Sequence, residues 1–303
     1  MSLARYALNF GLRRIERQFL ARAQPDELRR SFETKARLLT WAPRHTRRHA
    51  MELGGVPALR IEGPWVTEAR VLLYFHGGAF VFGSPETHAA LVARLARRAG
   101  VAAVLPRYRL APEHPFPAAL DDALSAFDGL LAEGVAPERI VLGGDSAGGG
   151  LALALLGSLV AQGGPLPAGL FAFSPVTDLT FSGASVVENR LREAMLPVER
   201  FPELQNLYLA GHPPEDPRAS PLFADFSGAG PIWLSVGDGE MLRDDTLRLA
   251  ERMRAQGVSV RVELGHDLPH VWPFFSPFLP EARRTLDALA RWFRRPGGPT
   301  GES

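Results

Sequence analysis

The segment from Arg139 to Leu155, RIVLGGDSAGGGLALAL, constrains the fold more than any other, because a short β-branched run leads directly into a glycine-rich turn and a long apolar helical pattern. This order predicts a nucleophile elbow with Ser146 at its tip. The flanking glycines leave room for strained backbone there. The helix that follows directs its unpaired N–H groups and the positive end of its dipole toward the place where a tetrahedral oxyanion would form. We therefore hypothesise a hydrolytic serine.

Two other interpretations of this segment stay open. A Gly-x-Ser-x-Gly pattern can mark only a tight turn, and a glycine-rich loop before a helix can bind a nucleotide. The nucleotide interpretation is weak, because residues 143–150 contain neither the lysine of a phosphate-binding loop nor the GxGxxG spacing.

Apolar runs and helical patterns alternate along most of the chain, after a hairpin signal around Gly54-Gly55. This alternation predicts an α/β fold, with eight strands in a mostly parallel sheet and helices on both faces. The expected strands are Arg47–Leu53, Val56–Ile61, Val71–Phe75, Val101–Leu105, Ile140–Leu142, Leu170–Phe173, Ile232–Val236 and Val258–Leu264. The expected helices are Leu3–Leu20, Asp26–Leu39, Thr87–Ala99, Ala118–Ala132, Gly149–Ala161, Leu242–Ala255 and Glu281–Arg294.

Residues 179–217 break this rhythm with five prolines and short helical pieces such as Glu203–Leu209. We interpret them as an insertion rather than a linker. The predicted organisation is N-terminal helices over 1–45, core segments over 46–178 and 218–295, the insertion over 179–217, and a disordered tail over 296–303. Some apolar residues of the insertion are candidates either for an acyl pocket or for the insertion's own core: Phe181, Leu191, Leu196, Phe201, Leu207 and Tyr208.

The first helix is amphipathic and basic. Leu3, Phe10 and Ile15 recur at roughly helical spacing with Ala7 and Phe19, and four arginines lie between them. A membrane-surface role is one interpretation of such a helix. The interpretation we favour from sequence is that the apolar stripe packs on the protein itself.

A nucleophilic serine needs a histidine to take its proton and a carboxylate to orient that histidine. On an α/β-hydrolase sheet these residues follow in the order serine, acid, histidine, each in a loop after a strand. The loop Gly237–Asp245 (GDGEMLRDD) holds acids, and the loop Gly265–Trp272 (GHDLPHVW) holds histidines. A third loop, His76–Phe80, follows an early strand, and its N–H groups are suited to an oxyanion hole.

Several segments, in this order, resemble the hormone-sensitive-lipase-like group of α/β-hydrolase esterases. The resemblance implies an α/β-hydrolase fold, carboxylic-ester hydrolysis through an acyl-enzyme on Ser146, and a cap made from the N-terminal helices and the insertion. Short to medium acyl esters are the expected substrates. The matching segments are HGGAF (His76–Phe80), YRLAPEHPFPAALDD (Tyr108–Asp122), GDSAGG (Gly144–Gly149), SPVTDL (Ser174–Leu179) and SPLFAD (Ser220–Asp225).

Alignment with this group selects Glu240 as the acid, where the group usually has aspartate, and His270 as the base. Asp238 stays open as a rival acid, since either carboxylate can orient an imidazole. Asp244 and Asp245 are expected to charge the start of the next helix. His266 is predicted to be a loop residue, because Pro269 argues against a helical pair of metal ligands.

The predicted oxyanion donors are the N–H groups of Gly78, Ala79 and Ala147. Ala79 departs from the group, which commonly has a third glycine there, but alanine still provides an N–H if its backbone angle suits a Cβ. We hypothesise that its methyl group narrows the alcohol side of the site and disfavours tertiary esters. His76 and Asp145 are expected to hold the loops by hydrogen bonds.

Composition excludes several other functions. A net charge of +1, without a block of one sign, gives no reason to expect a nucleic-acid partner. No cysteine is present, which fits a reducing compartment. Neither a signal peptide nor a long apolar span is found, so we expect a cytoplasmic protein without membrane insertion.

No cofactor or metal is expected. A homodimer is an expectation, and cleavage of amides, lactones or formamides, or non-catalytic binding, are the alternative functions.

Overall fold

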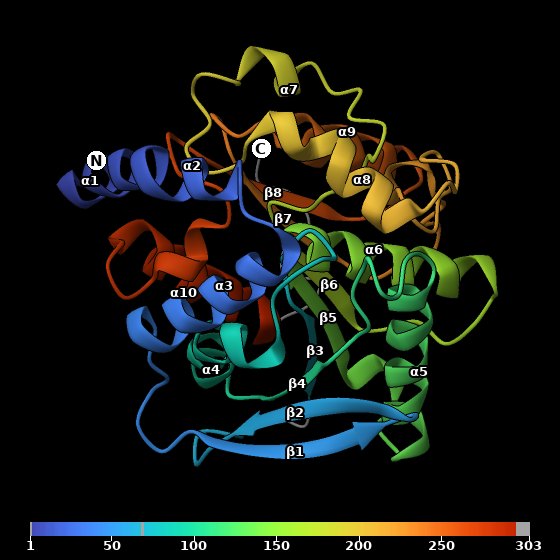
Figure 1. Cartoon of the computed structure of the whole chain (residues 1–303). Coiled ribbons are helices and arrows are strands. Elements are labelled where there is room, and N and C mark those ends of the chain that lie inside the picture. The colour runs from blue at the N-terminus through green and yellow to red at the C-terminus, as the bar shows by residue number, and fades with distance from the viewer. Residues whose placement is uncertain (1, 68–69, 295–303) are drawn as a thin grey trace.

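The computed structural model describes residues 2–67 and 70–294, and within them eight strands form one sheet. The strands are β1 (Arg47–Leu53), β2 (Val56–Glu62), β3 (Val71–Phe75), β4 (Ala102–Pro106), β5 (Ile140–Asp145), β6 (Gly169–Phe173), β7 (Ile232–Gly237) and β8 (Val260–Gly265). Their order is β1-β2-β4-β3-β5-β6-β7-β8 (Figure 1). β2 pairs antiparallel with β1 and β4, and all later pairs are parallel. The predicted mostly parallel sheet is confirmed.

Helices cover both faces of the sheet (Figure 1). One face packs against α4 (Pro85–Ala99) and α10 (Pro280–Arg294). The other packs against α5 (Ala118–Ala132), α6 (Ser146–Ala161) and α9 (Arg243–Ala255). Successive residues of β3 point to opposite faces, so Leu72 belongs to the first core and Leu73 to the second. Burial on both faces explains why these parallel strands are continuously apolar.

The remaining helices lie above this unit or join its parts (Figure 1). The N-terminal helices are α1 (Leu3–Gly11), a π-helical turn η1 (Leu12–Glu16), α2 (Arg17–Leu20) and α3 (Pro25–Leu39). Residues 179–217 contribute α7 (Ser185–Glu188), η3 (Val198–Arg200) and α8 (Phe201–Leu209). Single 3₁₀ turns are η2 (Pro137–Arg139), η4 (Pro221–Phe223) and η5 (Trp272–Phe275). The predicted domain boundaries stay predictions, and the tail over 296–303 lies outside the described residues.

Most predicted bounds differ from the structure by only a few residues, and the largest difference lies at the elbow. β5 continues to Asp145 and α6 begins at Ser146, three residues before the predicted helix start at Gly149. The run Gly148–Gly150 is helical in spite of its glycines. A Cβ at Gly148 would collide with the backbone of Phe75 and His76, so close packing selects glycine at this position.

The expectation that the apolar stripe of the first helix packs on the protein is wrong for most of that stripe. Leu3, Phe10 and Ile15 are 86%, 64% and 69% exposed. Arg5 and Asn9 are buried instead, and their side chains donate to the carbonyl oxygens of His266 and Asp267. α1 is therefore attached through Arg5 and Asn9 and through Leu8, which packs on a buried cluster that includes Trp272, while Leu3 and Phe10 face solvent.

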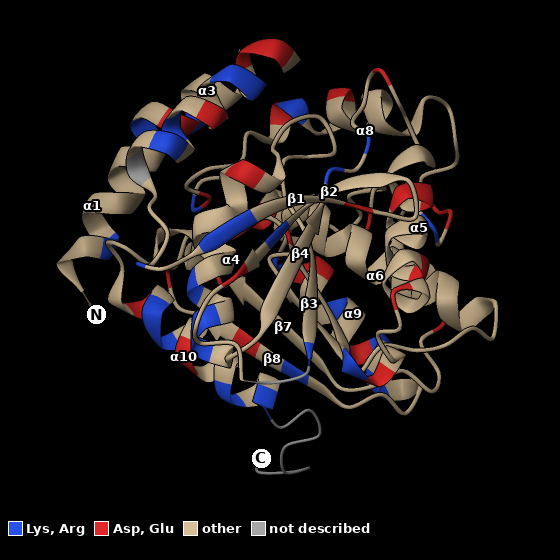
Figure 2. Ribbon diagram, turned by 90° about the horizontal axis from the view of Figure 1, so that it is seen from below, with Lys and Arg blue, Asp and Glu red and all other residues tan. Residues whose placement is uncertain are grey.

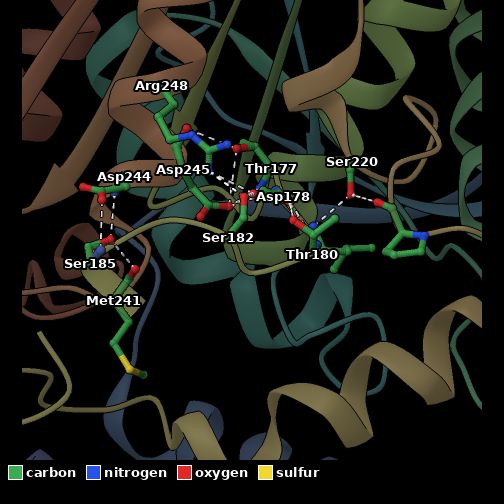
Figure 3. A network of polar contacts seen from close by, with 12 residues as sticks. Thr177, Asp178, Thr180, Ser182, Ser185, Ser220, Met241, Asp244, Asp245 and Arg248 are labelled. Carbon is green, nitrogen blue, oxygen red and sulfur yellow. Dashed lines mark hydrogen bonds and ion pairs between the residues drawn. The ribbon is translucent and has the colours of Figure 1, made fainter. Parts of the chain in front are cut away.

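A buried polar network attaches the start of the 179–217 segment to α9 (Figure 3). The Oδ2 atom of Asp245 accepts hydrogen bonds from the N–H groups of Thr177 and Asp178 at 2.7 and 3.0 Å. Asp178 forms an ion pair with Arg248 at 2.9 Å. Asp244 accepts from the N–H of Ser185. Asp244 and Asp245 thus lie in the first turn of α9, as predicted, and also bind the neighbouring segment.

Candidate active site

Ser146 lies at the junction of β5 and α6 with a φ of +52°. This left-handed conformation is rare for a residue with a Cβ and is typical of strained functional turns. It turns the chain sharply from strand to helix. Gly144 permits the turn, since a Cβ there would collide with the backbone of Gly148.

His270 connects Ser146 to Glu240. Its Nε2 lies 2.9 Å from Oγ of Ser146, and its Nδ1 lies 2.7 Å from Oε2 of Glu240. Glu240 and His270 are 1% and 2% exposed. The structure thus brings together the serine, histidine and glutamate selected from the sequence.

Ser174 fixes the carboxylate of Glu240, and sequence reasoning did not single it out. Its hydroxyl donates to Oε1 of Glu240 at 2.8 Å and accepts from the N–H of Val271. The N–H of Gly237 also donates to Oε1, at 2.6 Å. The residue lies in the SPVTDL segment, which was the available signal for it. Both oxygens of Glu240 are therefore occupied in an orientation that faces His270.

Asp238 lies in a different polar group. Its Oδ2 is 2.8 Å from Nδ1 of His266, and its Oδ1 accepts from the N–H of Asp267 and from Arg192. Burial raises the pKa of Asp238, but the bonds from Asp267 and His266 more than offset this and hold it below its usual range.

No group of side chains suited to a metal ion is found in the described ranges.

Glu193, a second buried carboxylate, also lies near His270, and sequence reasoning missed it. Its Oε1 accepts from the N–H groups of Met195 and Leu196, and its Oε2 accepts from the N–H of Met241, the neighbour of Glu240. Burial and the charge of Glu240 raise the pKa of Glu193. No sequence signal distinguished Glu193 from the other glutamates of the 179–217 segment.

These carboxylates act on the imidazole. Burial lowers the pKa of His270, but its bond to Glu240 and the negative charges of Glu240, Glu193 and Asp145 outweigh that effect, so the pKa is raised above its usual value. The site therefore stabilises a positively charged imidazole.

The loop after β3 presents free N–H groups beside Ser146. Gly78 has a φ of +128° and Ala79 a φ of +54°, and the N–H groups of both donate to no other residue of the described chain. Both residues line the same cavity as Ser146 and His270. Ala147, the third predicted donor, is the second residue of α6 and is fully buried.

Asp145 holds this loop, as the sequence predicted. Its Oδ1 accepts from the N–H of Gly77 at 3.0 Å and from the hydroxyl of Tyr74 at 2.7 Å, and its Oδ2 lies 3.3 Å from Nε2 of His88. Burial raises the pKa of Asp145, but the charge and hydrogen bond of His88 and the hydrogen bond of Tyr74 have a larger opposite effect. The pKa of Asp145 therefore lies below its usual range. Burial lowers the pKa of His76 to about 3, so His76 is neutral and serves the loop through hydrogen bonds.

A cavity of about 490 Å³ opens onto Ser146 and is lined almost entirely by apolar groups. The N-terminal helices, the 179–217 segment and the loop after β8 each form part of its wall. Of the six candidates from that segment, only Leu196 and Phe201 line it. Leu191 is 89% exposed, and Tyr208 stacks on Phe80 at 3.8 Å. The lining includes Leu12, Leu28, Phe32, Met195, Leu196, Phe201, Phe274 and Phe275.

The sequence profile of a family described as "alpha/beta hydrolase fold" matches residues 72–274, which include Ser146, Glu240 and His270. The chain belongs to the α/β-hydrolase fold family. Among solved structures, this hydrolase is similar to an esterase from the bacterial hormone-sensitive lipase family, with 38% identity, a TM-score of 0.93 and coverage of 98% of this chain and 99% of the other. A hormone-sensitive lipase from a metagenome library gives a TM-score of 0.90 at 34% identity, covering 96% and 98% of the two chains.

Curated relatives agree. The hydrolase is 40% identical to an acetyl-hydrolase of Streptomyces hygroscopicus over 77% of this chain and 80% of that protein. It is 36% identical to an esterase of Acinetobacter venetianus over 80% of each. The resemblance to the hormone-sensitive-lipase-like group is thereby confirmed. Among the described helices of this hydrolase, none is both long and apolar enough to cross a membrane.

Proposed function

We propose that this protein is a carboxylesterase in which Ser146 is the nucleophile, His270 the general base and Glu240 the orienting acid. The observation that carries the proposal is the continuous chain from Oγ of Ser146 through the imidazole to Glu240, with contacts of 2.9 and 2.7 Å. The names of its relatives, acetyl-hydrolase and esterase, support the same activity.

In the proposed reaction, Nε2 of His270 takes the proton of Ser146 while Oγ attacks the ester carbonyl. The tetrahedral intermediate collapses, the alcohol leaves with the proton from His270, and the acyl group stays on Ser146. Water then gives a proton to the same imidazole and attacks the acyl carbonyl, which releases the acid and restores the serine. Glu240 stabilises the imidazolium formed in both halves.

The proposed oxyanion donors are the N–H groups of Gly78, Ala79 and Ala147. Free N–H groups held by buried hydrogen bonds need no rearrangement when charge develops on the carbonyl oxygen. Asp145 supplies that rigidity through its bonds to Gly77 and Tyr74.

We propose short to medium acyl esters as substrates. The apolar lining of the cavity favours an aliphatic acyl chain, and its volume of about 490 Å³ is within the range of small-molecule sites. Within this proposal the cytoplasmic location and the homodimer remain predictions from the sequence.

The test is a chain-length series of chromogenic esters, with an amide and a lactone of the preferred acyl group, on the wild type and on Ser146→Ala, Glu240→Ala and Asp238→Ala. We expect Ser146→Ala to lose activity by a factor on the order of 10⁴ or more, and Glu240→Ala by on the order of 10² or more. Asp238→Ala should retain most activity. An Asp238→Ala loss larger than that of Glu240→Ala would transfer the acid role to Asp238.

A further inference from the structure

The outer face of α1 is apolar and uncovered. Leu3, Tyr6 and Phe10 are 86%, 56% and 64% exposed, and they follow one another at helical spacing. Figure 2 shows α1 at the edge of the molecule and almost without charge, in contrast with α3. The polar residues Arg5 and Asn9 point inward and bind the loop before His270. In α1, Arg5 and Asn9 face the protein and the aromatic side chains face solvent, which is the reverse of the usual arrangement of a surface helix.

Cations continue this face toward the next turns. Arg13, Arg14, Arg17 and Arg22 are separated by one acid, Glu16, whose carboxylate is paired with Lys35 at 2.6 Å. Arg13 and Arg17 donate to the carbonyl oxygens of Arg192 and Glu193, whereas Arg14 and Arg22 are exposed and form no ion pair with a carboxylate among residues 2–67 and 70–294. Arg14 lies 5.5 Å above the ring of Phe10, so cation and aromatic ring share one face. The segment therefore combines exposed apolar area with unpaired positive charge.

The same N-terminal segment, α1 and η1, forms a wall of the cavity. Ala7, Gly11 and Ile15 line it, and Ile15 is also 69% exposed. Phe278 lines the cavity as well, is 52% exposed and contacts the exposed ring of Trp41 at 5.8 Å. The exposed apolar surface therefore borders the entrance to the cavity that contains Ser146.

We propose that residues 3–22 dock the protein on an anionic lipid surface, with Leu3, Tyr6 and Phe10 in the headgroup region and Arg14 and Arg22 beside the lipid phosphates. Amphipathic helices with aromatic residues on one side and arginines nearby bind such surfaces in the interface plane. A lipophilic ester dissolved in that surface then faces the cavity entrance. Two-fold packing of this face against a second copy would bring the arginines of both copies together, which disfavours a dimer here.

The experiment measures sedimentation of the full chain with phosphatidylglycerol vesicles and with phosphatidylcholine vesicles. We expect binding to the first that weakens as salt is raised to about 0.5 M, where screening is strong. Tyr6→Ser/Phe10→Ser and Arg14→Gln/Arg22→Gln should each weaken binding by roughly tenfold or more. The matched control is Val66→Ser/Leu247→Ser, because these two residues are 38% and 37% exposed and lie after β2 and in α9, outside residues 3–22. It should bind like the wild type.

Hydrolysis of a water-soluble acetate ester separates docking from catalysis. Tyr6, Phe10, Arg14 and Arg22 do not line the cavity, so their variants should keep wild-type activity on this substrate. Absence of binding to phosphatidylglycerol, or equal weakening by the Val66/Leu247 control, would overturn the proposal. So would a wild-type dimer in light scattering that Tyr6→Ser/Phe10→Ser converts to a monomer without a change in vesicle binding.

Discussion

Positive φ values of 52° and 46° occur at Ser146 and Ser174, each directly after a parallel strand, and a φ of 54° occurs at Ala79 in the loop after β3. Such backbone costs a residue with a Cβ roughly 1–2 kcal/mol. These strained residues lie around His270. Because the strain reduces stability, we infer that the surrounding packing maintains it for the function of the site. Residue types and order predicted Ser146 and the loops that hold its partners, and the resemblance to the hormone-sensitive-lipase-like group then selected His270 and Glu240, with Asp238 left open as a rival acid. The positive φ values and the two further hydrogen-bonded residues, Ser174 and Glu193, depend on contacts that the sequence order does not reveal.

Ala79 provides a test of alcohol selectivity. Ala79→Gly removes the methyl group that we hypothesise narrows the alcohol side, so the kcat/KM ratio of tert-butyl acetate to ethyl acetate should rise by roughly tenfold, the usual effect of a methyl group in a specificity pocket. The matched control is Ala210→Gly, since Ala210 has a similar φ of +48° at the exposed end of α8. A ratio that rises equally in both variants, or in neither, would contradict the hypothesis.

Glu193 provides a test of imidazole tuning. Glu193→Gln removes one of the negative charges that raise the pKa of His270, so that pKa should fall. Because the base must be neutral, the acidic limb of the kcat/KM profile should move to lower pH, by a few tenths of a unit to about one unit. Glu188→Gln, at an exposed glutamate paired with Arg243, should leave the limb unchanged. A lower kcat with an unmoved limb would limit Glu193 to a structural role.

At the scale of the elements, periodicity predicted that residues 3–20 are helical but predicted the wrong inward face. The pattern reports which residues are apolar, whereas the buried face depends on what the helix meets. Here it meets the carbonyl oxygens of His266 and Asp267, which require donors, so Arg5 and Asn9 turn inward. No local sequence rule contains that information.

The free energy of unfolding should depend on pH through Asp245, which lies at the start of α9. Burial raises the pKa of Asp245 to about 7, whereas an unfolded aspartate titrates near 4. Between these two pH values Asp245 is protonated in the folded protein and ionised in the unfolded chain. Rising pH therefore favours the unfolded chain and should reduce the free energy of unfolding. Asp245→Asn keeps an oxygen acceptor for Thr177 and Asp178 without the charge, so its stability relative to wild type should rise by on the order of 2–4 kcal/mol from pH 4 to pH 8.

Urea unfolding at several pH values measures this difference. Asp244→Asn is the matched control, because burial raises the pKa of Asp244 but its bonds to Ser185 and Arg243 lower it to a net value below the usual range. Its carboxylate is therefore ionised in both states above about pH 5. The offset between Asp244→Asn and wild type should stay constant from pH 5 to pH 8. Parallel curves for Asp245→Asn and wild type would exclude a raised pKa at Asp245.

For the whole molecule, the α/β class and the chain order of the catalytic loops followed from local patterns, since a parallel sheet brings the carboxyl ends of its strands to one edge. The cavity could not be predicted from these local patterns. Its wall combines residues from the N-terminus, the 179–217 segment and the loop after β8, and only tertiary packing decides which of their apolar side chains face Ser146. Tyr208, a pocket candidate from sequence, contacts Phe80 instead.

Three arginines join the two segments that lie above the sheet. Arg13 and Arg17 donate to the carbonyl oxygens of Arg192 and Glu193. Arg200 donates in the opposite direction, from η3 to the carbonyl oxygens of Leu20 and Ala23, and its side chain is only 8% exposed. Because these bonds cross between segments about 180 positions apart, the two parts of the cavity wall should loosen together.

Arg200→Met tests that coupling. It leaves buried carbonyl oxygens without their donor, at a cost of about 1–3 kcal/mol each, so hydrogen exchange should speed up in both 3–24 and 193–209, while β5 and β6 stay protected. Activity on long-chain esters, which use more of the wall, should fall more than activity on acetate. Arg218→Met is the matched control, because its ion pair with Asp216 lies on the surface and should change stability by less than about 1 kcal/mol. Faster exchange confined to 193–209 would mean that the two segments open independently.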